Sequence, residues 1–72
     1  MNIPNEIIKM TLDKLHSGDH ITDEELSITV KSLSPILDLI RKLGEQYYLF
    51  WKELYMDLAT LKDYQQVRKE KG

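Results

Sequence analysis

The two histidines of the chain lie among carboxylates, in a pattern that could bind a metal ion. His16 and His20 are separated by three residues, and Asp13, Asp23 and Glu24 are close by in the sequence. Imidazole and carboxylate groups are ligands for zinc and nickel. This spacing crosses a glycine at an expected helix end, however, so it does not fix ligand geometry as two histidines one helical turn apart would. We therefore expect a solvated polar turn here and no metal site.

The sequence contains no pattern typical of an enzyme. Glu53 and Asp57 are one helical turn apart and could form a carboxylate pair for acid–base catalysis. Lys52 stands on the neighbouring face, so we expect both carboxylates to be part of a solvated surface. A Gly-rich phosphate loop, a nucleophile elbow and cysteine are all missing from the sequence. We predict a protein that is not an enzyme and uses no cofactor.

The length of the chain indicates one domain that needs additional stabilisation. Its 72 residues allow a single domain, residues 1–72, and a chain of this size buries only roughly 60% of the surface that it exposes when unfolded. Without cysteine there is neither a disulfide nor a thiolate zinc site. Self-association is the remaining common way to stabilise such a small scaffold, so we expect a homo-oligomer, most simply a dimer.

Charge and hydropathy argue against a nucleic-acid or membrane partner. The net charge is −2, which is not the basic footprint of a nucleic-acid-binding protein. The residues that would meet phosphates in a helix-turn-helix protein, Asp23, Glu24 and Glu25, are acidic. No segment approaches the roughly 18 apolar residues of a membrane span, and residues 1–12 lack the apolar run of a signal peptide. We expect a cytoplasmic protein.

Local signals predict an all-α fold that begins with two short helices. Apolar residues at helical spacing predict a first helix over about residues 4–16, with Pro4 in its first turn and Gly18 beyond its end. Thr22 and Glu25 form a capping box, in which each side chain binds the backbone N–H of the other. Ile21 and Leu26 flank this box as a hydrophobic staple. A second helix is therefore expected over residues 23–33.

The second half of the chain predicts one long helix. Proline inside a helix removes a hydrogen bond and costs about 3 kcal/mol, so we expect a break or sharp kink at Ser34–Pro35. Beyond it, apolar residues keep a constant helical phase across Gly44, which favours one helix over residues 35–69 rather than a turn at Gly44. Such a helix spans about 52 Å, and two short helices cannot cover it.

The apolar arc of this long helix is too wide for one neighbour, since it covers roughly 160° of the helix surface. We expect one side to pack on the chain's own helices and the other on a second copy, with Trp51 buried at the seam. The alternatives are an ordinary core and a small-ligand pocket. Leu49 and Met56 lie on the opposite face and are expected to be incidental. The expected interface residues are Tyr47, Phe50, Trp51, Leu54, Tyr55, Leu58 and Leu61.

These features predict a small, non-enzymatic helical module that binds proteins, first a copy of itself. Such a module would act as a regulator, adapter or inhibitor of another protein. In outline, a short acidic-capped helix that leads into a long aromatic-rich one resembles small bacterial and phage regulatory proteins, although this resemblance assigns a role to no residue. A small helical DNA- or RNA-binding regulator is the alternative.

Overall fold

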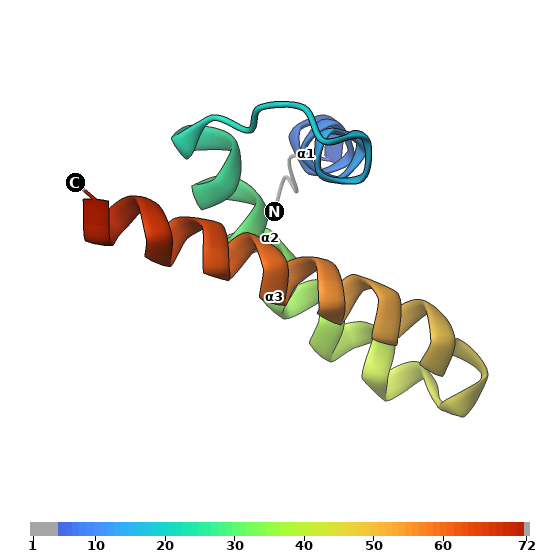
Figure 1. The fold of residues 1–72 in the computed structure, drawn as a ribbon. Coiled ribbons are helices and arrows are strands. Elements are labelled where there is room, and N and C mark those ends of the chain that lie inside the picture. Colours follow the sequence, from blue (N-terminus) through green and yellow to red (C-terminus); the bar gives the residue numbers. More distant parts are fainter. Residues whose placement is uncertain (1–4, 72) are drawn as a thin grey trace.

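The fold is all-α, as predicted: residues 5–71 form three α-helices with a short 3-10 turn between the last two. The computed structural model describes residues 5–71. Helix α1 comprises Asn5–Ser17, α2 Asp23–Leu43, η1 Glu45–Tyr47 and α3 Tyr48–Lys71. Helices α2 and α3 form an antiparallel hairpin, and α1 packs across it (Figure 1).

Helix α1 ends at a glycine in the left-handed conformation, as expected. Gly18 has φ +79°, and the next backbone N–H, that of Asp19, donates to the carbonyl of Lys14 at 3.0 Å. This bond, from the second residue after Ser17 to the third residue before it, is the Schellman arrangement. The expected start at Pro4 lies outside the described residues.

Helix α2 begins with the predicted capping box. The Glu25 N–H donates to the Thr22 hydroxyl at 3.1 Å, and the Thr22 N–H donates to the Glu25 carboxylate at 3.0 Å. The two residues of the expected hydrophobic staple are both in the core, with Ile21 2% and Leu26 1% exposed. The cap and the staple therefore fix the first turn of α2 together, and this prediction is confirmed.

The expected helix boundary at Ser34–Pro35 is wrong. Helix α2 runs without interruption through Pro35 to Leu43. The side chains that recur on its inner face before and after the proline are Leu26, Leu33, Leu37 and Ile40, and all four are buried. Ending the helix at Pro35 would break this stripe, and burial of each leucine stabilises by about 1.5–3 kcal/mol. The stripe therefore outweighs the lost hydrogen bond.

The continuous helix expected over residues 35–69 is also wrong, because the chain reverses at Gly44. This glycine has φ +113° and ψ 178°, a conformation that is essentially restricted to glycine. The apolar stripe keeps its phase across Gly44, but the reversal folds the stripe back on itself. A hairpin buries the two halves against each other, whereas a straight rod would leave both in water.

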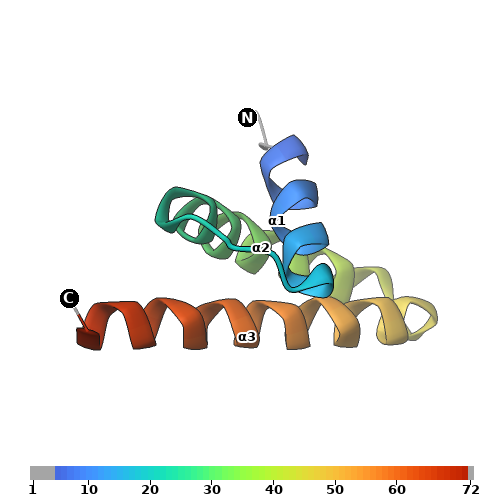
Figure 2. The ribbon, with the colours of Figure 1, turned by 45° about the horizontal axis from the view of Figure 1, so that its top comes forward.

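The core lies where α1 crosses the hairpin. Its buried residues come from α1, the α1–α2 loop, α2 and α3, and they are Ile8, Ile21, Leu26, Leu33, Leu37, Leu58 and Leu61. Helix α1 crosses near the middle of α3, so the end of the hairpin that contains η1 projects beyond it (Figure 2). Within residues 5–71, no helix is long and apolar enough to cross a membrane.

Candidate interaction surface

The projecting end of the hairpin is the most apolar exposed part of the molecule. All ten residues from 41 to 50 are exposed. At and beside this end, the large apolar side chains with at least two-fifths of their surface in solvent are Leu39, Leu43, Tyr47, Tyr48, Leu49 and Phe50. Single exposed apolar residues are ordinary, but a contiguous group marks a site of interaction.

Three aromatic rings form a stacked row along the start of α3. The ring centroids of Tyr48 and Trp51 are 6.3 Å apart, and those of Trp51 and Tyr55 are 5.1 Å apart, each pair with its planes 20° from parallel. Spacings of three and four residues place the rings on one face of the helix. We call this row the aromatic ladder.

The aromatic ladder faces away from α1. Asp57 contacts His16 of α1, and it lies about 200° around α3 from Tyr55, two residues earlier. The ladder therefore lies on the open side of the hairpin, which no other described element covers. Tyr48 and Tyr55 are 54% and 52% exposed, and Trp51 between them is half-buried.

A shallow hollow of about 430 Å³ lies beside the ladder at the turn of the hairpin. Its walls come from the end of α2, the turn and the start of α3, and they are Ile40, Arg41, Gly44, Glu45, Tyr47, Tyr48 and Trp51. The volume would suit a small ligand. Of the lining residues, however, only Ile40 is buried, so the hollow is a surface depression rather than an enclosed pocket.

The predicted interface residues divide into two groups. Leu58 and Leu61 are 5% and 0% exposed and belong to the chain's own core, against which Leu54 also packs. In this fold those three side chains pack within the chain and do not form a surface for a partner. The other four are Tyr47 at the end of η1 and Phe50, Trp51 and Tyr55 in the first turns of α3, and they are exposed or half-buried.

Sequence reasoning missed the contribution of α2 to this surface. Leu39 and Leu43 are 59% and 60% exposed and are one helical turn apart, beside the buried stripe of α2. The reversal at Gly44 brings them to the exposed end of the hairpin. They lie about 160° around α2 from Arg41, which borders the hollow beside the ladder, so they are on the side away from the ladder. Their spacing was visible in the sequence, but its meaning depends on that turn. Leu49 and Met56, expected on the opposite face, are 74% and 60% exposed.

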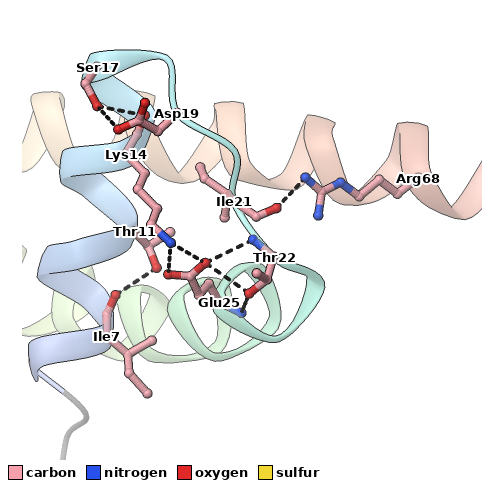
Figure 3. A network of polar contacts seen from close by, with 9 residues as sticks. All are labelled: Ile7, Thr11, Lys14, Ser17, Asp19, Ile21, Thr22, Glu25 and Arg68. Carbon is pink, nitrogen blue, oxygen red and sulfur yellow. Dashed lines mark hydrogen bonds and ion pairs between the residues drawn. The ribbon is translucent and has the colours of Figure 1, made fainter.

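At the other end of the hairpin, polar contacts tie α1 to α2 (Figure 3). The Lys14 ammonium donates to both carboxylate oxygens of Glu25 at 2.9 Å. This contact, together with the backbone N–H of Thr22, lowers the pKa of the Glu25 carboxyl from 4.5 to about 2. The capping glutamate therefore also holds the first helix in place.

The candidate chemical groups form structural contacts instead. His16 Nε2 lies 3.0 Å from the Asp57 carboxylate, so Asp57 is not the solvated surface residue that we expected. Its side chain is only 20% exposed. Between residues 5 and 71, no three His, Asp or Glu side chains gather as a metal site would require.

The terminal turn of α3 is fastened to the start of α2. Arg68 Nη1 lies 2.6 Å from the Asp23 carboxylate, and Nη2 donates to the carbonyl of Ile21 (Figure 3). One of the few basic side chains near the C-terminus is thereby engaged within the fold.

Comparisons with known protein families, with curated proteins and with solved structures found no match to this chain. The function proposed below therefore rests on the physical properties of the chain.

Proposed function

We propose that this protein is a small non-enzymatic interaction module that self-associates through the open side and the projecting end of its hairpin. As a dimer it would serve as a regulator, adapter or inhibitor of another protein. The observation that carries the proposal is the exposed apolar end of the hairpin, with the aromatic ladder along one side of it. A cytoplasmic location belongs to the same proposal, since a chain without cysteine suits a reducing compartment.

The surface area of the chain supports a missing partner. A monomeric protein of 8.5 kDa exposes about 4,700 Å² by the usual scaling of area with mass. This chain exposes 5670 Å², which is about 1,000 Å² more. Each partner in an interface of standard size buries about 800 Å². The excess is therefore of the size that one protein interface would cover.

The chemistry of the surface supports a protein partner. Tyrosine and tryptophan are enriched at binding hot spots, because they bury a large area and keep a polar group for the wet rim. Here a half-buried tryptophan lies between two exposed tyrosines. A hot spot of this kind has its anchor in the centre and its polar groups at the edge.

No observation favours the alternative of a DNA- or RNA-binding regulator. Asp23, Glu24 and Glu25 occupy the first turn of α2, and Arg68 is engaged by Asp23. Phosphate binding needs several free cations on one surface, and the projecting end of the hairpin is apolar instead.

Sedimentation equilibrium tests the proposal directly. At micromolar concentration we expect a mass of at least two chains for the parent. Tyr48→Lys places a charge on the ladder and should shift the population toward monomer. Met56→Lys is the matched control, because Met56 is similarly exposed, at 60% against 54% for Tyr48, but lies on another face. A monomeric parent would refute self-association, and a loss of dimer with Met56→Lys alone would move the interface to that face.

A further inference from the structure

The charges around the aromatic ladder are arranged so that the surface can complement itself. Arg41 and Glu45 line the hollow beside Trp51, and Asp38 lies one turn before Arg41 on the same side of α2. Lys62 follows Tyr55 by seven residues and so continues the ladder side of α3. Lys52, four residues after Tyr48 and three before Tyr55, and Lys69 are exposed on this side of α3 as well. The surface therefore carries charges of both signs, which suits a copy of itself better than a partner of one sign.

Four of these charges have no ion-pair partner among the described residues. Asp38, Arg41, Glu45 and Lys62 are all exposed. Among residues 5–71 the ion pairs are Lys14–Glu25, His16–Asp57 and Arg68–Asp23, and none of them involves these four. Their side chains are consequently available to a molecule that covers the ladder.

Lys62 and Glu45 lie at similar distances from the centre of the aromatic ladder, in opposite directions along the chain. The midpoint between Trp51 and Tyr55 is the centre of the aromatic anchor. Lys62 lies nine residues beyond that midpoint, which is about 13 Å along the helix. Glu45 lies eight residues before it, which is also about 13 Å when the wider rise of the 3-10 turn is included. Opposite charges thus stand at equal distances on either side of the anchor.

A two-fold axis through this midpoint, lying in the interface and perpendicular to the helices, makes the two copies of α3 antiparallel. Closed dimers have this symmetry, in which each contact occurs twice. The ladder of one copy then meets the ladder of the other. Glu45 of each copy comes level with Lys62 of the other, and Arg41 comes close to Asp38 of the other. A parallel arrangement would instead bring Glu45 toward Glu45.

We infer that the occupant of the ladder side is a second copy of this chain, seated antiparallel, with reciprocal Glu45–Lys62 pairs at the two edges of the aromatic anchor. This inference rests on the self-association proposed above and adds its surface, orientation and register. The apolar centre supplies affinity, and the flanking charges select the antiparallel register.

Charge reversal provides a test by rescue. Glu45→Lys and Lys62→Glu each place like charges together twice in the dimer, so each should weaken dimerisation about tenfold. The double variant Glu45→Lys/Lys62→Glu restores opposite charges and should return the dissociation constant to within about threefold of the parent. Glu45 and Lys62 are about 26 Å apart along one chain, so a rescue cannot arise within a monomer.

The matched control is Glu45→Lys/Lys69→Glu, which has the same net charge as the parent and the rescuing variant. Lys69 lies on the same side of α3 but about 10 Å beyond Lys62, and it should not restore dimerisation. Analytical ultracentrifugation over a dilution series measures all five proteins. Weak single variants with rescue by Lys62→Glu alone support the inference. If the single variants have no effect, or if Lys69→Glu also rescues, the proposed register is wrong although the dimer exists. If the parent never dimerises, the proposed function itself is refuted.

Discussion

Two threonines at the centre of the molecule differ in how their hydroxyls are satisfied. Thr11 and Thr29 are both 0% exposed. The Thr11 hydroxyl donates to the carbonyl of Ile7 at 2.7 Å, whereas the Thr29 hydroxyl has no hydrogen-bond partner among the described residues. A buried polar group without a partner costs about 1–3 kcal/mol. The Thr29 hydroxyl therefore weakens the core that surrounds it.

Replacing each threonine by valine, which has the same shape, should change stability in opposite directions. Thr29→Val removes an unsatisfied hydroxyl and should raise the free energy of unfolding by about 1 kcal/mol. Thr11→Val removes a hydroxyl that is hydrogen-bonded and should lower the free energy of unfolding by up to about 1 kcal/mol. Chemical denaturation at one fixed protein concentration measures both. Equal losses from the two variants would show that the Thr29 hydroxyl is bonded.

The Glu25 carboxylate makes the contact between α1 and α2 sensitive to acid. Its pKa is about 2 in the folded chain against an ordinary 4.5. A lowered folded pKa means that ionised Glu25 stabilises the fold fully above pH 4.5, and that this contribution disappears as the pH falls toward 2. Denaturation across this range should therefore show a smaller loss of stability for Glu25→Gln than for the parent. Glu24→Gln, which leaves the Lys14 contact intact, should retain the parent's loss.

At the scale of the elements, the helix boundaries that neighbouring residues determine were predictable from the sequence, and those that packing determines were not. The capping box at Thr22 and the end of α1 at Gly18 depend on neighbouring residues, so the sequence specifies them locally. The outcomes at Pro35 and Gly44 depend on what the flanking helices bury. Burial of the α2 stripe keeps the chain helical through Pro35, and burial of α3 against α2 makes the chain reverse at Gly44. Neither partner surface is visible before the fold is known.

The reversal at Gly44 can be tested against the milder glycine at the end of α1. A Cβ added at Gly18 or Gly44 would meet nothing within 4 Å, so substitution tests mainly the backbone conformation. Asparagine tolerates the left-handed conformation of Gly18 but not the φ of +113° at Gly44. Gly44→Asn should therefore cost about 2 kcal/mol, and Gly18→Asn clearly less. Equal effects in thermal denaturation would mean that Gly44 does not require glycine.

At the scale of the whole molecule, the sequence located the aromatic surface but not its limits. Of the seven expected interface residues, the hairpin uses Leu58 and Leu61 for its own core and leaves Trp51 half-exposed in the single chain. Leu39 and Leu43 are exposed at the same end of the hairpin, on a helix that the predicted boundary at Pro35 had divided. A periodic stripe shows which side chains avoid water, but it does not distinguish burial within a chain from burial between chains.

Trp51 can report on that distinction because it is the only tryptophan. It is half-buried in the single chain, so a partner that covers the ladder should move its fluorescence emission to shorter wavelength as protein concentration rises. In Tyr48→Lys the emission should stay at the position of the dilute parent, because the ladder is no longer covered. Met56→Lys should shift as the parent does.

Removal of the Trp51 ring should weaken both the folding and the self-association of the chain. Trp51→Ala removes packing against the core and the centre of the proposed seam, so the melting temperature should fall, with a loss of about 3 kcal/mol in unfolding free energy. The melting temperature of a dimer rises with protein concentration, because association stabilises the folded chain by mass action. We expect this dependence in the parent and in Trp51→Phe, which keeps an aromatic ring, but not in Trp51→Ala. Two results would contradict this expectation: a melting temperature of Trp51→Ala that still depends on protein concentration as in the parent, or a parent that dimerises with unchanged Trp51 emission. Either result would place the dimer contact on another face, such as that of Leu49 and Met56. The ladder would then contribute only to the stability of the single chain.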